Sequence, residues 1–74
     1  MKTEDEAKIC KDFGKNLAFI RRTLSWTQEK LALESGLAKS YVGEVERGVR
    51  NISLINIVKI ANTLGIDAYK LLMF

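Results

Sequence analysis

The apolar residues at the start of the chain follow the spacing of an amphipathic helix. Five of them are separated by four, four, three and four positions: Ile9, Phe13, Leu17, Ile20 and Leu24. This spacing places all five on one face of an α-helix, which they would cover over about four turns. The eight residues before them contain three acids and two lysines. The pattern therefore predicts a short acidic tail over residues 1–8, followed by a first helix.

Two shorter helices are predicted in the middle of the chain. Thr27 can cap a helix over residues 28–35, because its hydroxyl can accept a hydrogen bond from a free backbone N–H of the first turn. Gly36 tolerates the positive φ of a tight turn, and the helical pattern resumes over residues 39–47 until Gly48. The pattern thus predicts two short helices joined by a turn that contains glycine.

The rest of the chain also carries helical signals. Ser53 can cap a helix that runs to Leu64 and ends at Gly65, and Asp67 can cap a short last helix. No stretch alternates between apolar and polar residues in the manner of a β-strand. The prediction is an all-α fold of five helices in a single domain over residues 9–74, since a chain this short has room for only one core.

Residue types needed for catalysis or metal binding are scarce. The chain has one cysteine, Cys10, and no histidine, so it lacks the usual side chains of a zinc site and of thiol catalysis. The sequence also contains no glycine-rich loop of the kind that cradles phosphates. We therefore expect no enzyme activity, no metal, no cofactor and no small-molecule ligand.

The composition is that of an ordinary globular domain. Hydrophobic residues make up 47% of the chain and charged residues 28%. No apolar stretch approaches the roughly 18 residues of a membrane span, and the acidic start is unlike a signal peptide. We therefore expect a cytoplasmic protein with no membrane partner. The formal net charge of +3 permits a polyanionic partner without requiring one.

The two central helices have the residue spacing of a helix-turn-helix. Counted from Gln28, small and apolar residues fall at positions 4, 5, 9, 10, 15 and 18: Leu31, Ala32, Gly36, Leu37, Val42 and Val45. Ala32 allows the two helices to approach, Gly36 makes the turn, and the valines seat the second helix on the core. This geometry lets one helix brace another in the major groove of DNA.

Three stretches of the sequence resemble a known family. The stretches TQEKLA (27–32) and SYVGEVERG (40–48) resemble the signature of the repressor-like (Xre/Cro-type) helix-turn-helix regulators of phage and bacteria, and RNISL (50–54) resembles in particular the controller proteins of restriction-modification systems. The resemblance implies a transcriptional regulator that binds a symmetric operator in double-stranded DNA as a homodimer. It also implies that Glu46 pairs with Arg21 and does not touch DNA. A phage or chromosomal repressor of the same fold and an antitoxin-like protein-interaction module stay open as alternatives.

We predict contact with DNA along one edge of the helix-turn-helix and just beyond its end. Gln28 lies at the positive end of a helix, where a phosphate can bind. Lys39 and Ser40 open the second helix, whose first turn reaches base edges, and Arg50 is the strongest candidate for reading sequence. The predicted DNA-contacting residues are Thr27, Gln28, Lys39, Ser40, Tyr41, Gly43, Glu44, Arg47, Arg50 and Asn51.

Three of these residues have a second interpretation. Tyr41 can reach a phosphate through its hydroxyl or belong to the core. Gly43 costs about 1 kcal/mol in a helix interior, so it either allows close approach to a base or relieves crowding against another helix. Glu44 can accept a hydrogen bond from cytosine or simply be solvated. The sequence by itself leaves these alternatives open.

The last third of the chain has more apolar residues than one core stripe needs. One stripe is predicted to face the core: Leu54, Ile57, Val58, Ala61 and Leu64. Ile55 and Ile60 are left for a second stripe. Either the extra residues complete a small core, or they form a two-fold dimer that places two recognition helices about 34 Å apart. The predicted dimer residues are Ile55, Ile60, Ile66, Tyr69, Leu72, Met73 and Phe74.

Overall fold

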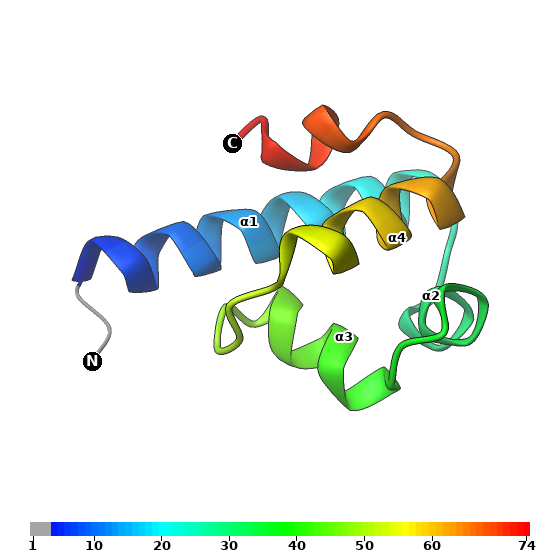
Figure 1. The fold of residues 1–74 in the computed structure, drawn as a ribbon, viewed down its shortest axis with the longest axis horizontal. Coiled ribbons are helices and arrows are strands. Elements are labelled where there is room, and N and C mark those ends of the chain that lie inside the picture. Colours follow the sequence, from blue (N-terminus) through cyan, green and yellow to red (C-terminus); the bar gives the residue numbers. More distant parts are fainter. Residues whose placement is uncertain (1–3) are drawn as a thin grey trace.

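A computed structural model describes residues 4–74 of the chain. The elements are α1 (Glu4–Thr23), α2 (Gln28–Ser35), α3 (Lys39–Glu46), α4 (Leu54–Leu64) and the 3-10 helix η1 (Ala68–Leu72). Figure 1 shows α2 and α3 below the long helix α1, and the C-terminal segment with η1 above it. Because residues 4–74 contain helices and no strand, the all-α prediction is confirmed for this part of the chain.

The first helix begins earlier than the apolar stripe indicates. Residues 4–8 belong to α1, where the sequence predicts an acidic tail, and the remainder of that tail, residues 1–3, lies outside the described residues. Acids fill the first turn of α1, where they face the positive end of the helix dipole. Lys8 and Asp12 add an ion pair of 2.6 Å one turn apart. These local electrostatic effects extend the helix without help from the core.

The prediction of a fifth α-helix is wrong. The final element, η1, is a 3-10 helix of five residues, and the side chain of Asp67 makes no capping hydrogen bond to it. A segment this short cannot recover the cost of starting an α-helix. Tertiary contacts hold it instead: Leu71 is fully buried, and the Nδ2 atom of Asn16 on α1 donates to the carbonyl oxygens of Lys70 and Leu71, each at 3.0 Å.

Capping explains where the middle helices start and end. The Thr27 hydroxyl accepts a hydrogen bond from the backbone N–H of Lys30, and the Ser53 hydroxyl accepts one from Asn56. Gly36 follows α2 with φ at 75°, in the left-handed region that favours glycine. The capping roles predicted for Thr27, Ser53 and Gly36 are therefore confirmed.

The core lies between α1 and the four elements that follow it. Six side chains are fully buried: Leu17, Leu31, Val42, Val45, Ile60 and Leu71. Gly14 marks the closest approach of α1 to α3, since a Cβ atom there would lie 2.4 Å from the carbonyl oxygen of Val45 and 2.5 Å from that of Glu46. The backbone of α3 thus rests directly on α1, which fixes the orientation of α3 relative to the rest of the domain.

Candidate nucleic-acid interface

The helix-turn-helix is formed by α2, a turn at Gly36 and α3. The backbone N–H groups of Gly36 and Leu37 both point to the carbonyl oxygen of Ala32, the second of them at 3.0 Å. Ala32 itself is buried between the helices, where a larger side chain would force them apart. α3 contacts both α2 and α1. The predicted spacing therefore corresponds to a structure in which α3 packs against α1 and α2 and leaves its remaining side exposed.

A buried ion pair ties α1, α2 and α3 together. Arg21 Nε donates to Glu46 Oε2 at 2.7 Å and Arg21 Nη2 to Glu46 Oε1 at 3.0 Å, while the side chains are only 9% and 6% exposed. Arg21 Nη1 also donates to the carbonyl oxygen of Trp26 at 2.8 Å. The hydrogen bond from Arg21 to Glu46 raises the pKa of Arg21 against the opposing effect of burial. The structure thus places the two residues of the predicted pair in direct contact.

Gln28 takes part in the same network. Its Nε2 atom donates to Glu46 Oε1 at 2.8 Å, so the amide holds the start of α2 against the end of α3. The sequence predicts that this side chain contacts a phosphate. The structure gives its amide nitrogen an internal partner, while α2 still directs the backbone N–H groups of its first turn outward.

The first turn of α3 is exposed. Lys39 and Ser40 project from it, and the side chain of Thr27 stands at the start of α2. Lys39 Nζ lies 3.6 Å from Glu29 Oε1, with both side chains mostly exposed, so this pair is weak and can be exchanged for another anion. Arg47 and Asn51 are exposed at the other end of α3 and in the loop after it.

Arg50 is held in place by two neighbours on α3. Its Nη2 atom donates to Glu44 Oε1 at 2.7 Å, and its guanidinium carbon lies 5.3 Å from the centre of the Tyr41 ring. The hydrogen bond to Glu44 raises the pKa of Arg50. Tyr41 is half-buried against the core, and its hydroxyl accepts a hydrogen bond from Asn56 Nδ2 at 3.0 Å. Glu44 and Tyr41 therefore have internal partners, and Asn56 is a supporting residue that was not predicted from the sequence.

Gly43 is buried, and the space beside it is filled by this chain. A Cβ atom there would lie 3.2 Å from Arg47 Nη1 and 3.8 Å from Gln28 Oε1. The closer group is the flexible end of the Arg47 side chain and the other is at an ordinary contact distance, so crowding against another helix does not require glycine at this position.

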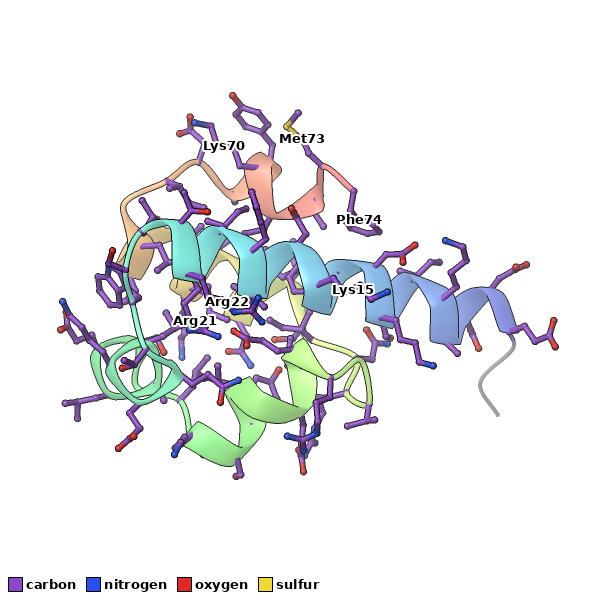
Figure 2. The ribbon with its side chains drawn as sticks, turned by 180° about the vertical axis from the view of Figure 1, so that it is seen from behind. Lys15, Arg21, Arg22, Lys70, Met73 and Phe74 are labelled. Atoms are coloured by element: carbon purple, nitrogen blue, oxygen red, sulfur yellow. The ribbon has the colours of Figure 1, made fainter. Side chains whose placement is uncertain are left out.

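A polar cavity of about 290 Å³ adjoins this surface. It is lined by Lys15, Ala18, Arg22, Gln28, Glu46 and Arg47. Figure 2 shows Lys15 and Arg22 along α1, near Arg21. Lys15 and Arg22 were not among the residues predicted to contact DNA. The available signal was their spacing with Lys11, since separations of four and seven residues place the three cations on one face of a helix.

The prediction for Ile60 is wrong, because this residue is 0% exposed within one chain. The stripe that α4 presents to the core keeps Ile57, Ala61 and Leu64 of the predicted set and adds Ile60. Leu54 and Val58, predicted to be internal, are exposed instead. The physical reason is the rotation of α4 about its own axis, which is set by its packing against α2 and η1.

The other predicted dimer residues lie on α4 and in the C-terminal segment, and most of them are exposed. Ile55, Tyr69, Leu72, Met73 and Phe74 are exposed, whereas Ile66 packs partly against the core. We call the exposed set the apolar patch: Leu54, Ile55, Val58, Tyr69, Leu72, Met73 and Phe74. Figure 2 shows Met73 and Phe74 at the end of the chain, beyond η1. Exposed apolar residues that adjoin one another on a surface are typical of association sites.

Two kinds of feature are absent from the described part of the chain: helices that span a membrane and groups of metal ligands. Within residues 4–74, no helix combines the length and the apolar character that crossing a bilayer requires. The same residues contain no group of three or more side chains arranged to hold a metal ion.

Known proteins resemble this chain over most of its length. Residues 17–71 match the family described as helix-turn-helix. The chain is 46% identical over 63 residues to the control protein C.BamHI of Bacillus amyloliquefaciens. This alignment covers 84% of this chain and 78% of that protein. It is 42% identical over 69 residues, 93% of this chain, to a hypothetical transcription factor of Neisseria meningitidis serogroup B, and it spans 65% of that relative's length.

The fold leads to the same group of proteins. The chain superposes with a TM-score of 0.88 on the crystal structure of the restriction-modification controller protein C.AhdI from Aeromonas hydrophila, at 46% identity and with 92% of this chain and 99% of that chain covered. These relatives are named as regulators rather than enzymes. The chain therefore belongs to the helix-turn-helix family of transcriptional regulators and, within it, to the controller proteins of restriction-modification systems.

Proposed function

We propose that this protein binds a two-fold symmetric operator in double-stranded DNA as a homodimer and regulates the transcription of restriction-modification genes. The observation that carries the proposal is α3 itself, whose first turn is exposed while its other side is held by the buried pair of Arg21 and Glu46. A helix fixed in this way can enter the major groove without losing its orientation. Binding of chromosomal or plasmid DNA would place the protein in the cytoplasm.

The residues around α3 have distinct roles in this proposal. Lys39 and Ser40 meet base edges from the first turn of α3. Arg50 reads a guanine, and its contacts with Glu44 and Tyr41 keep the guanidinium plane oriented before DNA arrives. Thr27, Gln28, Arg47 and Asn51 lie nearer to the backbone of the DNA and position the protein on it.

Replacement of Lys39, Arg47 and Arg50 together by alanine is expected to weaken operator binding by about 100-fold at 0.15 M salt. Each lost phosphate contact also reduces the magnitude of the negative slope of log Kobs against log salt concentration by about 0.9. Binding is measured by fluorescence anisotropy across salt concentrations, with circular dichroism to show that the variant is folded. If salt-sensitive binding were unchanged, the fold would serve protein interaction instead, as in an antitoxin-like module.

The operator itself can be found by selecting bound sites from random DNA with the wild-type protein. We expect two inverted half-sites whose centres are about 34 Å apart, one helical turn of DNA. Recovery of a single asymmetric site would contradict binding as a dimer.

Dimerisation is proposed to occur through the apolar patch. Ile55 is 69% exposed on α4, and a Ile55→Lys substitution would bury two charges at a two-fold interface. We expect this variant to sediment as a monomer at micromolar concentration and to lose at least about tenfold in operator affinity. The matched control is Leu33→Lys, at a residue of α2 that is 82% exposed and lies outside the patch. Equal sedimentation of the two variants would place the dimer interface elsewhere.

A further inference from the structure

We propose that the cavity between α1, α2 and α3 binds the phosphodiester backbone of operator DNA, so that Lys15 and Arg22 extend the interface from the helix-turn-helix onto α1. The inference rests on the proposed binding of DNA and adds a site to it. We call the residues that carry it the α1 basic face: Lys15 and Arg22.

The size of the cavity and the placement of its cations allow a phosphate group to approach from outside. Its volume is about 290 Å³. Lys15 and Arg22 are seven residues apart on α1, which places them on one side of the helix about 10 Å apart along its axis. Ala18, a small buried residue between them, lines the cavity. A separation of this size allows the two cations to contact different phosphates of the same strand.

The charge in the cavity is positive and not neutralised from within. Among the described residues 4–74, no ion pair involves Lys15, Arg22 or Arg47. Glu46 is the acid among the lining residues, and both of its oxygens already accept hydrogen bonds from Arg21. Three cations therefore face the cavity while the carboxylate there is occupied, which is the arrangement that an external anion would complete.

The cavity is continuous with the surface proposed to meet DNA. Gln28 and Arg47 line the cavity, and both were predicted from the sequence to touch DNA. Gln28 opens α2, where free backbone N–H groups and the helix dipole attract a phosphate. A strand that passes this helix end lies within reach of Arg22, and its neighbouring phosphates lie toward Lys15. The α1 basic face thus extends the path of the DNA backbone that the helix-turn-helix begins.

Contacts of this kind raise affinity without reading sequence. The test compares a Lys15→Gln/Arg22→Gln variant, called the cavity variant, with a Lys59→Gln/Lys70→Gln variant, called the control variant. The control variant lowers the net charge by the same amount, at exposed residues away from the cavity. Affinity for the selected operator and for scrambled DNA of the same length is measured from 50 to 300 mM salt. Circular dichroism and sedimentation verify that each variant is folded and dimeric.

For the cavity variant we expect both affinities to fall by the same factor, about tenfold or more. We also expect the magnitude of the salt slope for the dimer to decrease by about 3.6, which corresponds to four lost contacts at about 0.9 each. The control variant is expected to keep the wild-type slope. A Lys15→Arg/Arg22→Lys variant retains both charges and is expected to restore most of the slope. If the cavity and control variants lost equal affinity for DNA, long-range electrostatic attraction alone would explain the loss. If the cavity variant kept the wild-type affinity, α1 would lie outside the interface. Either result overturns the inference.

A free phosphate ion has the same chemistry and is distinguished in a separate measurement. Inorganic phosphate is titrated into the wild-type and cavity variants at constant ionic strength and followed by calorimetry. The cavity would be a site for small anions if the wild type bound phosphate, the cavity variant did not, and the cavity variant kept its affinity for DNA. The inference would then fail. Absence of specific operator binding by the wild type would instead refute the proposed function itself.

Discussion

An Arg21→Met variant is expected to lose about 3–5 kcal/mol of unfolding free energy, the cost of leaving a buried charge without its partner. The substitution removes three hydrogen bonds, two of them to Glu46 and one to the carbonyl oxygen of Trp26. Among residues 4–74, only Gln28 would then still donate a side-chain hydrogen bond to the Glu46 carboxylate, whose side chain is 6% exposed. The free energy is measured by urea unfolding, followed by circular dichroism.

Two further variants test the reason for this loss. Lys39→Met breaks an exposed pair with Glu29 and is expected to cost only about 0–1 kcal/mol. Arg21→Met/Glu46→Leu removes both charges and is expected to recover part of the stability lost in the single variant. A single variant as stable as Lys39→Met would show that burial of the pair carries no energetic weight.

The pH dependence of this pair has a definite sign. The pKa of Arg21 is raised in the folded state, chiefly by its hydrogen bond to Glu46. A cation whose pKa is raised in the folded state stabilises the fold fully below its unfolded-state pKa. This stabilisation is lost only as the pH rises through the folded-state pKa. For an arginine this window lies at strongly alkaline pH, so the contribution of Arg21 should not change between pH 6 and 9.

A Gly14→Ala variant is expected to lose about 3 kcal/mol of unfolding free energy, at the upper end of the range for overpacking. The added methyl group would meet the backbone oxygens of Val45 and Glu46 at 2.4 and 2.5 Å, and backbone atoms cannot rotate away. Because α3 would have to move off α1, we also expect weaker operator binding. Urea unfolding and fluorescence anisotropy measure the two effects.

Gly43→Ala is the matched control for this prediction. The atom nearest to its added methyl group is Arg47 Nη1, at 3.2 Å, and this is the end of a flexible side chain. Alanine is favoured over glycine within a helix by about 1 kcal/mol, so Gly43→Ala should be neutral or stabilising. The close approach of α1 and α3 would be refuted if Gly14→Ala were equally tolerated.

The apolar residues of α4 separate what the sequence predicts from what it does not predict. The spacing of apolar residues correctly indicates a helix over α4, because a period near 3.6 is a property of one segment. It does not decide that Ile60 is buried while Leu54 and Val58 are exposed. That outcome depends on how α4 is rotated against α2 and η1, which are distant parts of the chain.

The helix-turn-helix, its caps and its turn were determined by the sequence itself, because Thr27, Gly36 and the buried residues of α2 and α3 act over a few neighbouring positions. Tertiary structure alone decided three other features. It made the last element a 3-10 helix held by Asn16, it gave Arg50 its partners on α3, and it placed Lys15 and Arg22 beside Gln28 and Arg47. Each of these depends on packing between segments, and no local pattern of residues encodes the relative orientation of packed helices.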